Sequence, residues 1–335
     1  MELNIQLIQI GKLNNLSHER SIIGPNNRYL NLIVELIGYE FIIIEGKIEI
    51  DNRASSEVKE KLLKFIEIIE KLLDNNISLG ERELINIYES VNSNNVNDLL
   101  EVYLKKELVT TLSNGKPIYA KTINQINYLR SLESSDIIFA VGPAGTGKTF
   151  LGVCYASKLL KTGMCKKIVL VRPVVEAGEK LGFLPGDLKE KIDPYLVPLY
   201  DCLDDCFGKE HVTKLMEKGA IEVCPLAYMR GRTLDNSVII LDEAQNATTS
   251  QMKMFLTRLG FNSKMIITGD ITQIDLPYNA KSGLVEAFEL LSNIKGISMC
   301  KFDKSDVMRH PLVYKIVAKY EKNFLDDLKD IKNED

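Results

Sequence analysis

The sequence contains no run of eighteen or more apolar residues, so no helix is expected to span a membrane. Its first residues, MELNIQLIQIGKL, lack the basic region, long apolar core and small-residue cleavage site of a signal peptide. Cysteine is also scarce, with six residues in 335, which is too few for a disulfide framework. These absences predict a protein of the reducing cytoplasm with no membrane partner.

An excess of positive charge is missing too. The chain has 42 basic and 46 acidic residues, which gives a net charge of −4. Because a strongly basic domain is the usual electrostatic sign of nucleic-acid binding, the overall charge gives no such indication. A nucleic-acid partner therefore has to be argued from local sites.

The length suggests two or three domains, and the first, residues 1–108, is predicted to be a small α+β unit. Residues 4–10 alternate like a strand, and residues 41–51 read as two strands that meet near Gly46. Apolar residues from Val58 to Leu73 recur at helical spacing. The polar stretch 93–98 is predicted to be a loop.

The sequence pattern changes in the middle of the chain, where a linker is predicted before a second domain. Asn114-Gly115 and Pro117 favour a turn, so residues 109–120 are predicted to be a linker. Short apolar strands then alternate with helices over residues 121–328, and 329–335 form a tail. This alternation predicts an α/β domain with a mostly parallel sheet and helices on both faces. The expected strands are IIFAV, KIVLV, IEVCP, VIIL and KMIIT.

A phosphate-binding loop follows the first of these strands. The segment GPAGTGKT has the spacing G-x-x-x-x-G-K-[ST], with a strand before it and a helix after it. Glycine-rich backbone and a helix N-terminus can bind phosphates, Lys148 can neutralise the β- and γ-phosphates, and Thr149 can bind Mg²⁺. An ordinary glycine turn is the alternative. The predicted ATP-binding residues here are Gly142, Pro143, Ala144, Gly145, Thr146, Gly147, Lys148, Thr149 and Phe150.

Two adjacent carboxylates end the strand VIIL. At the end of a neighbouring strand in such a sheet, Asp242 would hold Mg²⁺, while Glu243 would activate the attacking water. Gln245 is expected to contact the γ-phosphate or that water. The alternative, that the two acids cap the next helix, is disfavoured because Thr248 and Gln251 already form a capping box.

Gln273 follows the strand KMIIT and Gly269-Asp270, so it is a candidate sensor of the γ-phosphate. Two glutamines near the carboxylates suit water activation better than transfer to a substrate hydroxyl. The sequence therefore favours an ATPase over a small-molecule kinase.

Several long blocks together resemble the PhoH family of ATPases. They include GPAGTGKT, LAYMRGRTL, ILDEAQN, TGDITQIDLP and DVMRHPLVYKIV, and the resemblance covers roughly residues 110–325. This block is also similar to the first RecA-like domain of superfamily 1 helicases. The resemblance implies a RecA-like P-loop NTPase fold, ATP and Mg²⁺ as ligands, and hydrolysis coupled to RNA or single-stranded nucleic acid.

The same resemblance implies roles for residues outside the loop. Gln125 would recognise adenine, and Arg172 would touch single-stranded nucleic acid. Arg230 and Arg232 would bind a phosphate backbone or a neighbour's ATP, and Arg309 would complete an ATP site as an arginine finger. A polar helix-face position for Gln125, and solvated or salt-bridged positions for the arginines, are the alternatives.

The helicases carry a second RecA-like domain. None is expected here, so the resemblance implies that a neighbouring subunit in a ring or hexamer completes the site. The N-terminal unit resembles a KH-type RNA-binding domain, whose GXXG loop reads Gly24-Pro25-Asn26-Asn27 here, with Arg20 and Arg28 nearby. The second glycine is missing, and oligomerisation is the alternative role. No nuclease domain is expected.

Two functions thus remain open from the sequence. The first is an ATPase that binds, moves along or remodels RNA, in the manner of a helicase. The second is a nucleotide-dependent switch or assembly protein that acts on protein partners without RNA.

Overall fold

The computed structural model describes residues 6–92, 95–173, 188–277, 280–308, 312, 313 and 316. Contacts divide the chain into two units, which separate between Lys105 and Lys106, and the second unit ends at Asp306. Arg309 and the predicted tail at 329–335 lie outside the described residues.

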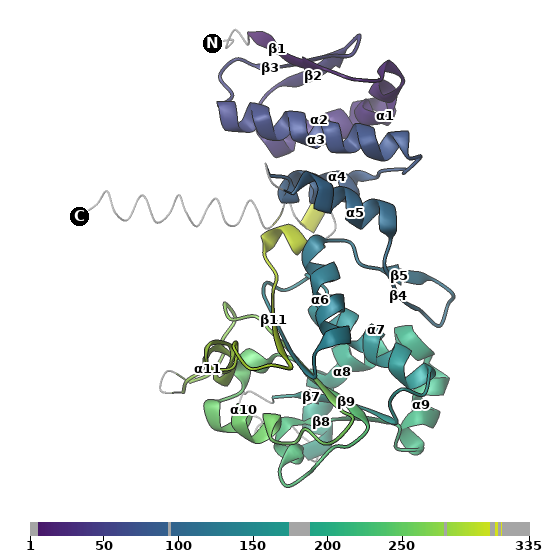
Figure 1. Cartoon of the computed structure of the whole chain (residues 1–335), viewed down its shortest axis with the longest axis vertical. Coiled ribbons are helices and arrows are strands. Elements are labelled where there is room, and N and C mark those ends of the chain that lie inside the picture. The colour runs from purple at the N-terminus through teal and green to yellow at the C-terminus, as the bar shows by residue number, and fades with distance from the viewer. Residues whose placement is uncertain are drawn as a thin grey trace, which may run out of the picture. The chain divides into compact units, whose positions relative to one another are not determined.

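The first unit combines a three-stranded antiparallel sheet, in the order β1-β3-β2, with helices (Figure 1). The two strands predicted around Gly46 are β2 and β3, and the glycine turns between them with a φ of 74°. The predicted apolar spacing is the buried face of α3, where Leu62 and Phe65 are fully enclosed. The elements are β1 (Leu7–Lys12), α1 (Glu19–Ile23), α2 (Arg28–Ile37), β2 (Phe41–Ile44), β3 (Lys47–Asp51), α3 (Ser56–Asp74), α4 (Glu81–Ser90) and α5 (Val96–Lys105).

The prediction of a loop through residue 98 is wrong at its end, because α5 already begins at Val96. Asn95 precedes the helix, and its side-chain amide donates to the Ser90 carbonyl at 2.6 Å. The buried residues Leu99 and Val102 then hold the helix in place. Polar composition alone therefore did not distinguish a helix start from a loop.

The second unit contains a six-stranded parallel sheet in the order β11-β6-β10-β9-β7-β8 (Figure 1). The five predicted strands are β6 to β10, which confirms the α/β fold of the P-loop type; β11 was not predicted. The elements are β4 (Leu108–Thr111), β5 (Pro117–Tyr119), α6 (Ile123–Ser134), β6 (Ile137–Val141), α7 (Lys148–Lys161), β7 (Lys167–Arg172), α8 (Leu188–Phe207), α9 (Lys209–Glu217), β8 (Ile221–Pro225), β9 (Ser237–Leu241), α10 (Thr249–Leu256), β10 (Lys264–Gly269), α11 (Gly283–Leu290) and β11 (Ile297–Lys301).

Helices cover both faces of this sheet, so its central strands are apolar throughout. Phe139 and Ile267 point to the face covered by α10 and α11, where Phe255 and Leu284 complete the core. Helices α6, α7 and α8 pack against strands from the other side. Because all six strands are parallel, their carboxyl ends meet at one edge of the sheet, where ligands of such folds bind.

The residues predicted as a linker, 109–120, fold into an antiparallel hairpin of β4 and β5 within the second unit. The turn signal at Asn114-Gly115 is real, with Gly115 at a φ of 83°. It closes a hairpin because Leu112 N–H bonds to the Lys116 carbonyl across the turn.

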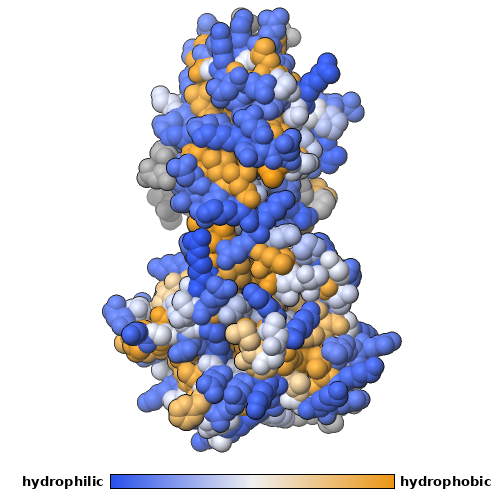
Figure 2. Space-filling view, turned by 45° about the vertical axis from the view of Figure 1, so that its right-hand side comes forward, coloured by the Kyte–Doolittle hydropathy of each residue, from blue (hydrophilic) through white to orange (hydrophobic). Residues whose placement is uncertain are grey.

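Among the described residues, no helix is both long enough and apolar enough to cross a membrane. The face shown in Figure 2 is largely hydrophilic, with separate hydrophobic areas between hydrophilic residues. All six cysteines carry free thiols.

Candidate nucleotide-binding site

The loop between β6 and α7 has a backbone that requires glycine. Gly145 and Gly147 have φ values of 84° and 82°, in the left-handed region that other residues avoid. At Gly142, a Cβ atom would lie 2.4 Å from the carbonyl oxygen of Phe302, which follows β11. The loop is therefore held against the segment that follows an adjacent strand.

Lys148 begins α7 and folds back over this loop. Its ammonium donates to the carbonyl oxygens of Gly142 at 2.6 Å and Pro143 at 2.7 Å. Burial lowers the pKa of Lys148, while nearby Asp270 and Asp242 act in the opposite direction. A phosphate group offers a stronger acceptor than these carbonyls, so the side chain is poised to exchange them for an anion.

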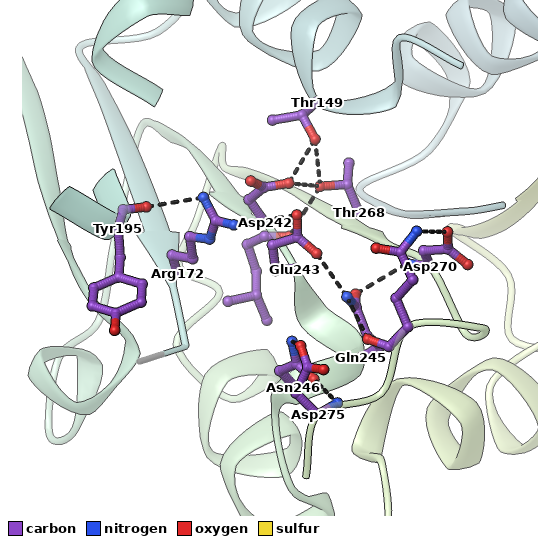
Figure 3. A network of polar contacts seen from close by, with 12 residues as sticks. Thr149, Arg172, Tyr195, Asp242, Glu243, Gln245, Asn246, Thr268, Asp270 and Asp275 are labelled. Atoms are coloured by element: carbon purple, nitrogen blue, oxygen red, sulfur yellow. Dashed lines mark hydrogen bonds and ion pairs between the residues drawn. The ribbon is translucent and has the colours of Figure 1, made fainter. Parts of the chain in front are cut away.

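Thr149 and Asp242 lie side by side (Figure 3). The Thr149 hydroxyl donates to Asp242 Oδ1 at 2.6 Å, and the Thr268 hydroxyl donates to the same oxygen at 2.9 Å. The two hydroxyls are themselves 3.2 Å apart. Two of these side chains were expected to meet, and the third, Thr268, was not predicted.

Thr268 enters the cluster because of the strand order. Asp242 was expected at the end of a strand next to β6, but β10 lies between β6 and β9. Thr268, near the end of β10, lies between the loop and Asp242 and is fully buried. Strand order depends on long-range pairing, so no local pattern pointed to this threonine.

The donor set fits a magnesium ion. Hydroxyl and carboxylate oxygens are the hard ligands that Mg²⁺ prefers, and neighbouring ligands of an octahedral ion lie about 2.9 Å apart when each bond is 2.0–2.1 Å. The 2.6 Å separation of the Thr149 and Asp242 oxygens is close to that span. Thr149 and Asp242 would hold the ion, with Thr268 orienting the carboxylate.

Glu243 points away from Asp242 because its backbone adopts the left-handed conformation, with φ 51° and ψ 38°. Such a conformation is costly for a residue with a side chain and is concentrated at functional sites. The carboxylate is held on both sides, by Arg172 Nη2 at 3.3 Å and by Gln245 Nε2 at 2.6 Å. The two carboxylates therefore have different partners, and their separate roles in catalysis stay a prediction.

Gln245 is a positioning residue in this structure. Its side chain is 1% exposed, and its oxygen accepts the Asp270 N–H at 3.0 Å. Its amide nitrogen donates both to Glu243 and to the Gln273 carbonyl. Both amide N–H groups and one acceptor position of the oxygen are thus occupied, so Gln245 is placed to act through Glu243. Its direct contact with phosphate or water stays a prediction.

Asp270, which sequence reasoning noted only as the end of a strand, joins the loop to Gln273. One carboxylate oxygen accepts the Ala144 N–H at 3.1 Å and Gln273 Nε2 at 2.9 Å, while the other accepts the N–H and hydroxyl of Thr272. The signal that could have found it is the acid directly after a strand that ends beside the phosphate loop. Gln273 itself is exposed and stays a candidate sensor.

These groups surround a cavity of about 320 Å³. Its lining contains three carboxylates, two cationic side chains and the exposed half of the glycine-rich loop. The lining residues are Ala144, Gly145, Gly147, Lys148, Thr149, Phe150, Arg172, Pro198, Cys202, Asp242, Glu243, Gly269, Asp270 and Gln273. Gly142, Pro143 and Thr146, also predicted to bind ATP, are not among them: the first two supply the carbonyls that receive Lys148, and Thr146 is buried.

Gln125 lies behind the loop. It is 3% exposed, donates to the Thr146 carbonyl at 3.1 Å and accepts the Lys121 N–H at 2.8 Å. This arrangement supports the phosphate loop from α6. The predicted adenine contact would require the amide to leave these partners.

The arginines predicted to contact nucleic acid have different surroundings. Arg232 forms a two-bond ion pair with Glu222, at 2.6 and 2.8 Å, which lowers the pKa of Glu222 to about 2. Arg28 pairs with Glu81 in the first unit. Arg230 is exposed, with no hydrogen bond or ion pair to the described residues. Arg172 lines the cavity, and Arg309 lies outside the described residues.

Known proteins are similar in sequence to this chain over most of its length. The chain matches the family described as PhoH-like protein over residues 117–321. A PhoH-like protein of Bacillus subtilis is 49% identical over 313 residues, which cover 93% of this chain and 96% of that protein. A PhoH-like protein of Synechocystis is 53% identical over 66% of this chain and 67% of its own length.

Among solved structures, a Sulfolobus solfataricus SWI2/SNF2 ATPase core in complex with dsDNA aligns over 44% of this chain and 31% of its own. The sequence identity is 16% and the TM-score 0.28, a similarity too distant to carry an argument about this chain. The family match and the 49% identity over nearly the whole length are decisive. The chain belongs to the PhoH-like protein family and is of the P-loop ATPase type.

Proposed function

We propose that this chain binds ATP with Mg²⁺ in the cavity at the carboxyl edge of the parallel sheet and hydrolyses it to ADP and phosphate. One observation carries the proposal: the hydroxyl of Thr149 and the carboxylate of Asp242 meet at 2.6 Å beside Lys148. A hydroxyl from the phosphate loop and an acid from a separate strand have no packing reason to converge on a cavity lined by backbone amides. A bound triphosphate and its cation give them one.

In this proposal, the loop amides and Lys148 bind the phosphates, and Glu243 orients a water molecule in line with the terminal phosphorus. The water oxygen forms a bond to that phosphorus as the bond to the bridging oxygen of ADP breaks. Glu243 accepts the proton of the water, and the electron pair of the broken bond stays with ADP. Magnesium, held by Thr149 and Asp242, supplies positive charge to the phosphate oxygens. Gln245 and Arg172 keep Glu243 in position from opposite sides.

We also propose that hydrolysis is coupled to RNA or another single-stranded nucleic acid, as in a translocating or remodelling enzyme, and that the chain assembles into a ring or hexamer. The exposed Arg230 and the slight positive balance of residues 106–306, with 25 basic and 23 acidic residues, support the first point. The free thiols support a cytoplasmic location.

The test is phosphate release by the full chain, with and without a single-stranded RNA, alongside the mass of the assembly in solution. Lys148→Ala should abolish release, because the cationic contact to the terminal phosphates is lost. RNA should raise the turnover of the unaltered chain. A turnover that ignores RNA and DNA of every tested length would contradict the coupling, and release that survives Lys148→Ala would contradict the site.

A second candidate, a nucleotide-dependent switch acting on protein partners, is favoured by the first unit. Residues 1–105 hold 17 acidic and 11 basic side chains, a net charge of −6, and Arg28 there is already ion-paired. Such a surface repels a phosphate backbone. Slow hydrolysis that is indifferent to RNA, together with an assembly size that depends on ATP, would favour this candidate.

A further inference from the structure

We infer that Arg172 belongs to the nucleotide site of its own chain and donates to the terminal phosphate of ATP. This inference rests on the proposed function and extends it to a residue that sequence reasoning assigned to nucleic acid. Arg172 is the last residue of β7, and the neighbouring strand β9 leads directly into Asp242 and Glu243. Pairing of the two strands therefore brings the guanidinium to the carboxylates, as the Asp242 N–H bonded to the Val171 carbonyl at 2.9 Å shows.

The surroundings of Arg172 face the cavity. Its Nη2 lies 3.3 Å from Glu243 Oε1, and its Nη1 donates to the Tyr195 carbonyl on α8 at 2.9 Å. The side chain is 20% exposed, so most of it is withdrawn from the outer surface that a polynucleotide would contact. Figure 3 shows the guanidinium between Tyr195 and Glu243, on the side of Glu243 opposite Gln245.

Charge in the cavity requires a second cation. Asp242, Glu243 and Asp270 carry three negative charges, and only Lys148 and Arg172 oppose them among the described lining residues. A triphosphate entering this cavity adds further negative charge in a site partly shielded from water, where repulsion is strong. Lys148 and the magnesium ion act on the phosphates from the side of the loop. Arg172 supplies positive charge from the side of Glu243, where the terminal phosphate must lie for water to be activated.

The guanidinium carries five N–H groups. Among the described residues, one of them makes the hydrogen bond to the Tyr195 carbonyl, and Nη2 forms the ion pair with Glu243, which leaves donors for a further acceptor. The 3.3 Å contact to Glu243 is long for a charge-assisted bond, so a phosphate oxygen can compete for it. Holding Glu243 and the terminal phosphate with one planar group would fix the relative position of base and reacting atom.

The test compares binding of the imido analogue of ATP with binding of ADP, each with Mg²⁺, to the full chain. Arg172→Gln should weaken binding of the analogue about tenfold or more and leave ADP within about twofold, because only the analogue has the terminal phosphate. The turnover number should fall by about 10²–10³-fold. Affinity for a single-stranded oligouridylate should stay unchanged. Lys218→Gln, which removes a cation from the exposed end of α9, is the matched control and should change neither affinity nor turnover.

Two outcomes overturn the inference. A loss of oligouridylate affinity with an unchanged ratio of the two nucleotide affinities makes Arg172 a nucleic-acid contact. A rise in turnover makes it a restraint on Glu243. Arg172→Lys, which keeps the charge and loses the fork, should give an intermediate ratio and decides the matter if Arg172→Gln does not fold. Measuring the two nucleotide affinities on the diluted, monomeric chain distinguishes the effect of Arg172 from that of an arginine supplied by a neighbouring subunit. If the unaltered chain releases no phosphate, the proposed hydrolysis fails while the affinity ratio still tests Arg172.

Discussion

Glu70 in the first unit and Asp270 in the second are both nearly buried carboxylates that accept several hydrogen bonds. Glu70, 3% exposed, receives the backbone and side-chain amides of Asn14 and the N–H of Asn15, and so fastens the segment after β1 to α3. Asp270, 5% exposed, receives Ala144 and Gln273, which both line a cavity. The local physics is the same, and only the position at the carboxyl edge of a parallel sheet connects the second acid to a ligand.

The two units also differ in charge and in where their buried polar groups lead. The first carries a net charge of −6, against +2 for residues 106–306. In the second unit, the buried side chains of Thr268 and Gln245 bond to Asp242 and Glu243, and these two acids line the same cavity as Lys148. In the first, Glu70 and Asp51 each bond to nearby turns. Burial of polar groups thus indicates function only when several of them share one destination.

The largest expected effect is that of Asp242→Asn, because it removes the charge of the carboxylate that we propose as a magnesium ligand. Turnover should fall by about 10³-fold, with a higher magnesium concentration needed for the remaining activity. Phosphate release measured across a magnesium titration checks this. Glu70→Gln is the matched carboxylate-to-amide control in the other unit: it should reduce stability by about 1–3 kcal/mol and leave turnover unchanged. Equal turnover for the Asp242 variant and the unaltered chain would contradict the idea that buried acids act in catalysis in the second unit and only in stability in the first.

Gln245→Met should have the next largest effect. The change leaves the Asp270 N–H and the Gln273 carbonyl without their partner and frees Glu243 on one side, so turnover should fall by about 10²-fold and the free energy of unfolding by about 1–3 kcal/mol. Gln273→Met, at an exposed position, should lower turnover without that loss of stability. Kinetics paired with urea unfolding of both variants separates the roles. If the Gln245 variant were as stable as the unaltered chain, the three hydrogen bonds of Gln245 would not contribute to the free energy of unfolding.

The sequence predicted most of this site because the informative residues are close together in it. The loop 142–149 and the pair Asp242-Glu243 each carry their chemistry in a few consecutive positions. Thr268 and Asp270 were not assigned, since their roles come from β10 lying between β6 and β9, a pairing between segments far apart in the chain.

The other differences between the predicted and the observed site come from hydrogen-bond and ion-pair partners, which the sequence around a residue does not show. Gln245 was expected to contact the γ-phosphate or the attacking water, but its amide bonds to Glu243 and to Asp270 and Gln273, which follow β10. For Arg232, contact with phosphate and a salt bridge were both open from the sequence, and the structure shows the salt bridge, to Glu222. A hydrogen-bonding side chain is predictable by type, whereas its partner depends on the fold.

Arg232→Gln should act on stability and on its dependence on pH. Arg232, with Lys167, depresses the pKa of Glu222 to about 2, so this ion pair stabilises the fold fully above the ordinary glutamate pKa near 4.5 and is lost as the pH falls toward 2. The variant should be less stable by about 1–3 kcal/mol at pH 7, and the difference should shrink between pH 4.5 and 2. Urea unfolding at pH 7, 4 and 3 measures it. A difference that grows on acidification would contradict the assignment.

Arg230→Gln should weaken binding of single-stranded RNA modestly and leave the stability unchanged, because Arg230 is exposed and has no bonded partner among the described residues. Removing one phosphate contact should reduce the slope of log affinity against log salt concentration by about 0.7. Fluorescence anisotropy at several salt concentrations gives that slope. An unchanged slope would remove Arg230 from the RNA-binding surface.

The smallest effect is expected for Arg28→Gln, the matching change in the first unit. Arg28 is also exposed, but it pairs with Glu81 and sits in a unit that carries six more negative than positive charges. A phosphate backbone would have to displace that carboxylate and approach an acidic surface, so RNA affinity should change by less than about twofold and the salt slope should stay the same. The two arginine variants measured together test whether the units differ as their charges indicate. If Arg28→Gln reduced the slope as much as Arg230→Gln, the first unit would bind RNA through the turn at residues 24–27, and its acidic charge would not be what decides its partner.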